Sequence, residues 1–239
     1  MKIALLKRWS ILLIAVMVVV GGCSSAPKPY TINIDASIAR GLGYFEERAL
    51  RKNLEWAVDS VSAFLNKPFA ETLQVVIFEH GWAYGGDRTV HLGKKRIKNR
   101  EAIIYGVTEA IAELQVYTFK SKGLAGLMVM QYYERNGGGS YVLKFLRDNA
   151  DKLLPIDSLM NNSSIFINDN DSNTKVNWLE PAAFYAYLLH RDGLTKFQEF
   201  YGNDLDGIEV RYGASVDSLD AEWRNWLLGN SATDTVSFR

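Results

Sequence analysis

Apolar residues along the chain change their spacing, and each spacing predicts a different element. They recur at helical spacing over residues 44–66, which predicts an amphipathic helix. Residues 73–78 form an apolar run rich in β-branched side chains, typical of a buried strand, and residues 89–92 predict a second strand after a turn at 85–87. Helical spacing then returns and predicts helices near 103–114, 123–135, 141–149, 181–191 and 219–228. We expect an α+β fold, in which an N-terminal helix and a small mixed sheet are followed by a mainly helical C-terminal part.

The first 22 residues have a different pattern from the rest of the chain. Lys2, Lys7 and Arg8 precede an unbroken apolar run at residues 11–20. Ten apolar residues rise only about 15 Å as a helix, which is too short to span a bilayer core of about 30 Å. The segment is therefore typical of a removable secretory signal.

The leader ends on the sequence Val-Gly-Gly-Cys at 20–23, which resembles the lipobox of bacterial lipoproteins. The resemblance implies cleavage before Cys23, acylation of the new terminus (palmitate included) and a membrane anchor made of several acyl chains, which anchor stably where one does not. Cys23 is the only cysteine, so an intramolecular disulfide is excluded. Ser24 and Ser25 stand where signals for inner-membrane retention usually carry Asp, which by family analogy favours the outer membrane, facing the periplasm. The alternative is an ordinary signal peptide beside an accidental cysteine.

The roughly 217 residues that follow this leader allow one large domain or two small ones. Pro27 and Pro29 lie among small polar residues, a pattern that favours a tether. We expect a leader at 1–22, a lipidated tether at 23–34, one domain at 35–228 and a tail at 229–239. Basic and acidic residues are equal at 27 each, and three of the basic ones lie in the leader, so the processed chain is acidic. Its one short basic cluster, at residues 94–100, is typical of a solvated loop, and we expect no nucleic-acid partner.

Two segments in the middle of the chain carry candidate chemistry. They read Thr-Glu-Ala-Ile-Ala-Glu-Leu at 108–114 and Ser-Lys-Gly-Leu-Ala at 121–125, and they resemble the HExxH and SEGLA segments of gluzincin-type metallopeptidases, the peptidase MA-like group. In that family two histidines and the second-segment Glu bind zinc, and the first-segment Glu activates water. Here Thr108 and Ala112 stand at the histidine positions and Lys122 at the ligand-Glu position, whereas Glu109 matches the general base.

The resemblance extends over most of the mature chain. Residues 184–193 look like the aromatic helix near the end of the family's domain, and residues 212–227 look like its closing helix, so the resemblance covers roughly 44–228. It implies a gluzincin-like α+β fold whose zinc site is degenerate at Thr108, Ala112 and Lys122. We therefore expect no zinc cofactor.

Glu109 and Lys122 have two interpretations. On a helical wheel Glu109 lies opposite the apolar stripe of Ile103, Val107 and Ile111, which predicts a solvated or structural side chain. Alternatively, the Lys122 ammonium stands where a dication is expected in the family, pairs with Glu109 and neutralises its charge in the cleft.

Other metal ligands are sparse. The histidines, His80, His91 and His190, are far apart in sequence, so we expect hydrogen-bonded or exposed side chains. Oxygen-bearing side chains at Asp169, Asp171, Asn173 and Glu180 have the spacing of an EF-hand calcium loop, but Thr174 stands where that loop needs glycine. An Asn/Asp loop that caps the next helix is the other interpretation.

Aromatic residues crowd the C-terminal third, which predicts either a core or a cleft for a peptide or glycan. They are Trp178, Phe184, Tyr185, Tyr187, Phe197, Phe200, Trp223 and Trp226. We expect a lipid-anchored envelope protein whose pseudo-metallopeptidase domain binds or scaffolds an envelope protein or peptide. The alternative is a metal-dependent envelope peptidase or hydrolase that uses Glu109 with an atypical metal set.

Overall fold

The computed structural model describes residues 27–114, 118–135, 141–166, 173–201 and 208–229. The predicted leader with Cys23 lies outside the described residues, as do Asp169, Asp171 and residues 230–239 of the predicted tail. Within the described ranges, no helix is both long and apolar enough to cross a bilayer.

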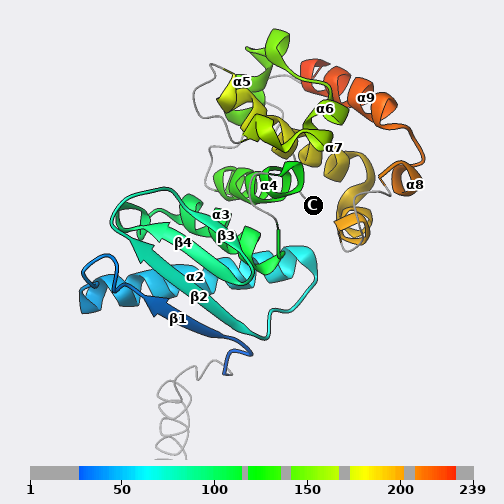
Figure 1. The fold of residues 1–239 in the computed structure, drawn as a ribbon. Coiled ribbons are helices and arrows are strands. Elements are labelled where there is room, and N and C mark those ends of the chain that lie inside the picture. The colour runs from blue at the N-terminus through cyan, green and yellow to red at the C-terminus, as the bar shows by residue number, and fades with distance from the viewer. Residues whose placement is uncertain (1–26, 115–117, 136–140, 167–172, 202–207, 230–239) are drawn as a thin grey trace, which may run out of the picture.

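The expected α+β order is confirmed (Figure 1). The N-terminal part holds a four-stranded sheet and two long helices, and the C-terminal part is helical. The first part contains β1 (Thr31–Asp35), α2 (Tyr44–Leu65), β2 (Thr72–Phe78), β3 (Tyr84–Gly86), β4 (Thr89–Gly93), the 3-10 turn η1 (Lys94–Arg96) and α3 (Arg100–Ile111). The second part contains α4 (Phe119–Arg135), α5 (Tyr141–Arg147), η2 (Ala150–Lys152), α6 (Ile156–Asn161), η3 (Ser163–Phe166), α7 (Thr174–Tyr201), α8 (Ile208–Tyr212) and α9 (Val216–Gly229).

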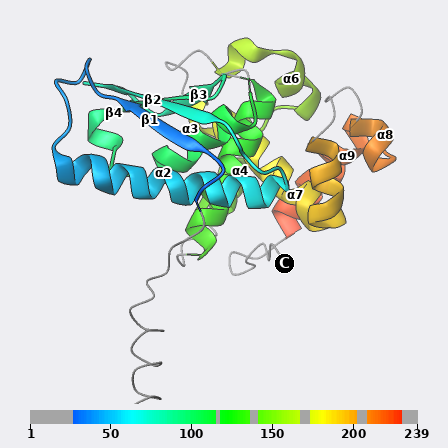
Figure 2. The ribbon, with the colours of Figure 1, turned by 90° about the horizontal axis from the view of Figure 1, so that it is seen from below.

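The sheet is mixed and covered by helices on one face. Its strand order is β1-β2-β4-β3, with β1, β2 and β4 parallel and β3 antiparallel to β4. Leu73, Val75 and Ile77 of β2 alternate inward and are fully buried, as period-2 alternation requires. Figure 2 shows α2 and α3 on that one side of the sheet. The other face carries polar pairs such as Asn33 with Gln74.

Strand β1 corrects the predicted tether at 23–34. Residues 31–35 pair in parallel with β2, so the folded part begins before residue 35. As an edge strand, β1 only half-buries Ile32 and Ile34, and two apolar residues are too few for a clear alternation. Among the described residues, the buried hydrophobic core lies between Tyr30 and Leu227. The chain without its leader therefore contains all of this described core.

The turn predicted at 85–87 is displaced. Gly85 and Gly86 belong to β3, and the hairpin turns at Asp87 and Arg88, which both have positive φ, at 45° and 59°. Positive φ at both central residues is the type I′ geometry that suits a twisted hairpin. Gly85 is needed for close approach rather than for the turn, because a Cβ there would lie 2.0 Å from the Gly106 carbonyl oxygen of α3.

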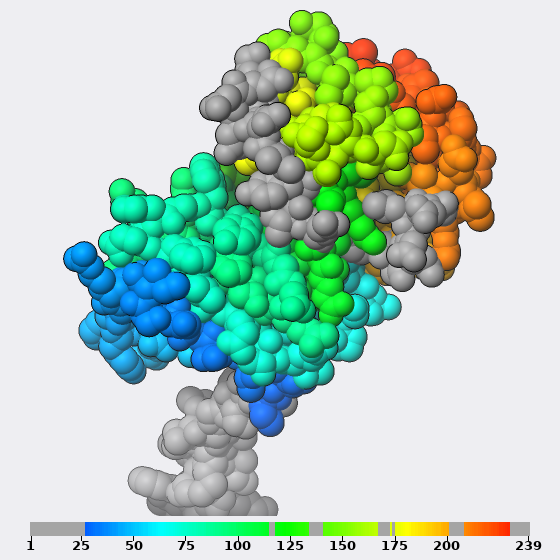
Figure 3. Space-filling model, viewed as in Figure 1, coloured from blue at the N-terminus to red at the C-terminus, as the bar shows by residue number. Residues whose placement is uncertain are grey.

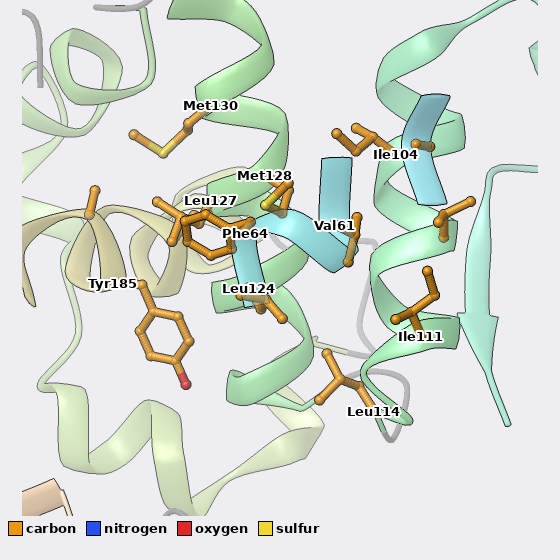
Figure 4. Packing of buried hydrophobic residues seen from close by; sticks show 14 of the residues in the cluster. Val61, Phe64, Ile104, Ile111, Leu114, Leu124, Leu127, Met128, Met130 and Tyr185 are labelled. Atoms are coloured by element: carbon orange, nitrogen blue, oxygen red, sulfur yellow. The ribbon is translucent and has the colours of Figure 1, made fainter. Parts of the chain in front are cut away.

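The two parts share one core (Figure 4). Val61 of α2, Ile104 of α3 and Leu124 of α4 all belong to it, and α4 packs closely on α7. Gly123 makes that packing possible, since a Cβ on it would lie within 3.0 Å of the Tyr185 ring. The prediction of a core for the C-terminal aromatic residues is confirmed for six of the eight. These are the buried Phe184, Tyr185, Tyr187, Phe197, Phe200 and Trp223.

Two helices differ from their predicted bounds. The helix predicted at 181–191 is longer, because α7 begins at Thr174, includes Pro181 and continues past a break at Gly193. Gly193 has φ 82° and ψ 171°, so the backbone leaves helical geometry at this residue and the helix resumes after it. Helix α4 begins four residues before the expected 123, with the Thr118 hydroxyl accepting from the Ser121 N–H.

Candidate functional site

The two segments that resemble the metallopeptidase signatures lie together at the junction of the two parts. Asn99 caps the start of α3 by accepting from the Ala102 N–H, which fixes where the helix begins. Glu109 lies in its last turn, and Glu113, with φ 52°, ends it in the left-handed region. Helix α4 packs against α3 and presents Lys122 in its first turns.

Glu109 is fully buried, so the prediction of a solvated or structural side chain is wrong for the solvated case, and the structural case remains. The wheel treats α3 as covered on one side, whereas strand β3 and helix α4 both pack on it. The Gly85 N–H donates to Glu109 Oε2 at 2.8 Å, and the Ser121 hydroxyl donates to Oε1. A hydrogen bond from Tyr105 also reaches the carboxyl group. Glu109 therefore ties β3, α3 and α4 together.

Burial raises the pKa of Glu109 above its ordinary value. The hydrogen bonds from Ser121 and Gly85 and the charge of Lys122 act in the opposite direction and favour the carboxylate. The group is thus a buried acid with several donors around it.

Lys122 lies beside Glu109, as the second interpretation of the sequence requires, but it contacts an intermediary. Only 5% of the residue is exposed. Its Nζ donates to Tyr105 Oη at 2.9 Å and lies 4.4 Å from the centre of the Trp178 ring. Because Tyr105 in turn bonds to Glu109, the ammonium and the carboxyl group are linked through a phenol. We call Gly85, Tyr105, Glu109, Ser121 and Lys122 the Glu109 network.

Three members of this network were not among the predicted site residues. Tyr105 precedes Glu109 by four residues, and that spacing alone places both on one helix face. Ser121 begins the second motif segment, but the motif gives no role for its hydroxyl. The role of Gly85 could not be read from sequence, because it depends on how the hairpin packs on α3.

The remaining positions of the motif carry no metal-binding group. Thr108 is fully buried, and its hydroxyl donates to the Ile104 carbonyl oxygen at 2.6 Å. Ala112 is the C-cap residue of α3 and has no polar side-chain atom. In the part of the chain that the structure describes, no three His, Cys, Asp or Glu side chains lie close enough to hold a metal ion.

The histidines occupy three separate surroundings. His80 is exposed, whereas His91 stacks between Tyr84 and Phe78, with ring centres 4.5 Å and 5.4 Å away. Burial lowers the pKa of His91. His190 is exposed and packs on Trp226.

Glu180, the last position of the calcium pattern, points into the helical part and is fully buried. Its Oε2 accepts from the Leu154 N–H at 3.2 Å, and its Oε1 lies 3.9 Å from Arg224 Nη2. Burial raises its pKa to about 8. Residues from Thr174 on are helical, and Asn173 accepts through its carbonyl from the Asn177 N–H. Since Asp169 and Asp171 lie outside the described residues, the structure does not decide between a calcium loop and a loop that caps the next helix.

Comparison with known proteins gives one structural similarity. Neither a family model nor a curated protein sequence matches the chain. Among solved structures, the chain is similar to a mutant M1 zinc metallopeptidase from Deinococcus radiodurans, at 14% sequence identity and a TM-score of 0.47. The similarity covers 87% of this chain and 49% of the other, so this chain spans about half the length of that protein.

Proposed function

We propose that this chain is a lipid-anchored envelope protein whose domain is a non-catalytic, metallopeptidase-like module that binds or scaffolds another envelope component. One observation carries the non-catalytic part of the proposal. The acid that matches the general base of the motif is fully buried and hydrogen-bonded to Gly85, Ser121 and Tyr105.

A general base must come within about 2.6–3.2 Å of the proton that it removes, directly or through one water. Glu109 has no exposed surface, and its carboxyl oxygens already accept from backbone and side-chain donors of this chain. The position that resembles the family's third ligand carries the buried ammonium of Lys122. A cation built into the chain at this point disfavours a dication in the same space.

The alternative, a hydrolase that uses Glu109, has one observation in its favour. Burial raises the pKa of Glu109, and general acids and bases in enzymes are often tuned in this direction. The pKa values of structural carboxyl groups in buried networks are shifted in the same way, so the access of substrate and water to the carboxyl group decides between a catalytic and a structural role. Glu109 lacks access to solvent, and we therefore favour the structural role.

The test compares the wild-type chain with Glu109→Gln in digestion assays on casein and on peptidoglycan. We expect no metal-dependent turnover by either protein. Turnover that requires added zinc or another divalent ion, and that is lost in a Glu109→Gln variant whose circular dichroism shows it to be folded, would establish the hydrolase instead.

The lipid anchor is a separate part of the proposal and rests on the Val-Gly-Gly-Cys sequence at 20–23. Acylation of Cys23 would place the domain at a membrane surface, in our proposal the periplasmic side of the outer membrane. The short distance between Cys23 and β1 leaves about seven residues as a tether. A binding module held this close to a membrane would meet partners that are themselves membrane-bound.

A further inference from the structure

Exposed apolar side chains gather at the edge of the sheet where the parallel strands end. Trp82 is 69% exposed, Tyr44 73% and Phe45 81%, and Ile38 is exposed as well. These four are half of the eight large apolar residues that are exposed in the described part of the chain. Single exposed apolar residues are ordinary, but a group of them at one edge is not.

The topology brings these residues together. Because β1, β2 and β4 are parallel, the segments that follow them all begin at the same edge. The Lys94 ammonium donates to the Ala39 carbonyl oxygen at 2.8 Å, which joins the end of β4 to the loop after β1. A Cβ on Gly93 would lie 2.3 Å from the Gly81 carbonyl oxygen, so the loop after β2 is in contact too. In Figures 1 and 2 the loop after β1 and the start of α2 lie at one end of the molecule, and in Figure 3 they protrude there in blue.

Cations lie among the apolar side chains. The Arg96 guanidinium lies 4.0 Å from the centre of the Trp82 ring, and Lys95 and Lys98 are exposed on the segment that follows β4. An open cavity of about 510 Å³ adjoins them, lined by Lys95, Lys98, Arg100, Asn99, Glu101 and Tyr132. We call Ile38, Tyr44, Phe45, Trp82, Lys94, Lys95, Arg96 and Lys98 the strand-end patch.

Most acidic side chains near the patch are bound to neighbouring groups of the chain. Glu46 accepts from the Gly43 N–H at the start of α2, and Glu47 pairs with Arg51 in the next turn. Asp35 accepts from the Ser37 N–H. Glu79 is exposed between β2 and Trp82. Lys95 and Lys98 are both exposed to solvent.

We propose that the strand-end patch is a docking surface for a bilayer that contains anionic lipids. Aromatic rings with an apolar body favour the membrane interface, and Lys and Arg beside them are attracted to anionic headgroups. Exposed Trp, Tyr and Phe side chains with a rim of cations suit a membrane surface better than a protein partner, because protein–protein interfaces are depleted in lysine. The patch acts as a second membrane contact besides any acyl anchor.

The position of the tether fits this role, a step that rests on the proposed acylation of Cys23. Residues 24–30 can span up to about 25 Å when extended. Strand β1 has five residues and is about 17 Å long. The tether is therefore long enough for the acyl anchor and the far end of β1 to reach the same bilayer. Stable membrane attachment commonly needs two such signals.

The experiment uses residues 24–239, which contain the complete described core and lack both leader and cysteine. Sedimentation with vesicles is measured for phosphatidylcholine alone and for phosphatidylcholine with phosphatidylglycerol. We expect salt-sensitive binding to the anionic vesicles only. Lys95→Glu with Lys98→Glu should weaken the partition coefficient about 25-fold or more, since each lysine contributes about fivefold at an anionic surface. Phe45→Ser with Trp82→Ser should weaken it about tenfold.

Matched controls lie elsewhere on the surface. Lys67→Glu with Lys152→Glu changes the net charge equally, and Val210→Ser with Leu228→Ser removes apolar groups of similar average exposure. Neither control should alter binding by more than about twofold. The proposal is overturned if the chain ignores anionic vesicles, if the patch variants bind like the wild type, or if the patch variants change only self-association. Because Cys23 is absent, each of these results is independent of acylation.

Discussion

The most direct perturbation of the Glu109 network removes its two charges one at a time. Glu109→Gln keeps the size of the side chain but places an amide nitrogen among the donors of Gly85, Ser121 and Tyr105. It also leaves the Lys122 ammonium, which is 95% buried, without its neighbouring negative charge. Loss of one partner of a buried pair costs about 3–5 kcal/mol, and a buried donor left unsatisfied costs about 1–3 kcal/mol. We expect Glu109→Gln to lower the free energy of unfolding by about 3 kcal/mol or more.

Lys122→Met should cost less. It removes the charge but leaves the three hydrogen bonds of Glu109 in place, and Met can lie along the same path beside Trp178. A carboxyl group that has lost its cation has a further raised pKa and can keep its bonds as the neutral acid. We expect a loss of about 1–2 kcal/mol. The double variant should lose less than the sum, with a coupling energy of about 1–2 kcal/mol, because the ammonium acts through Tyr105.

Urea unfolding of the wild type, both single variants and the double variant measures this cycle. Lys144 and Asp148 give a control pair, since they also place a lysine beside an acidic residue, but their side chains are 59% and 57% exposed. Their cycle should give a coupling of about 0.3–0.5 kcal/mol. A coupling below about 0.5 kcal/mol for Glu109 and Lys122 would contradict this prediction. It would mean that the two charges do not share one buried network.

Three further predictions test other parts of the account. Glu180 has a pKa of about 8 in the folded chain against an ordinary 4.5, so its ionisation opposes folding. Its contribution to stability is fully present below about pH 4.5 and is lost as pH rises toward 8. Glu180→Gln should reduce this loss, measured by urea unfolding at pH 5 and pH 8. Gly85→Ala should lower the free energy of unfolding by about 2 kcal/mol or more, because its Cβ would overlap the Gly106 carbonyl oxygen. The control Gly229→Ala has open space around it and should change the stability little. Equal melting temperatures for the two variants would contradict the close approach at Gly85. Cys23→Ser should leave an unprocessed precursor or release the chain from the membrane fraction, and normal processing with membrane retention at high salt would exclude acylation at Cys23.

The long elements of the fold could be predicted from the sequence because their apolar spacing is regular. The helix at 44–66 was placed within one residue of α2, and the strand at 73–78 within one residue of β2. Edge strand β1 could not be predicted, since only Ile32 and Ile34 mark its inner face. The start of α7 was hidden by Pro181, which stands inside the helix and is usually a sign of its beginning.

The candidate site was predicted in part. The similarity of the two motif segments placed Glu109 and Lys122 together, and the structure brings them together through Tyr105. The burial of Glu109 could not be predicted, because it follows from long-range packing of the β3–β4 hairpin on α3. A helical wheel describes one helix by itself and omits its neighbours, whereas α3 is covered by elements that precede and follow it in the chain.

In our proposal, the Glu109 network occupies the position where the metallopeptidases that the motif resembles hold zinc, and it binds no metal. The most direct test is metal analysis of the purified chain after equilibration with zinc and removal of the free ion. Structural and catalytic zinc sites need three or four good ligands, which Thr108, Ala112 and Lys122 do not supply. We predict zinc well below one equivalent per chain and a melting temperature that a chelator does not change. One tightly held zinc per chain, with a lower melting temperature after chelation, would contradict the account.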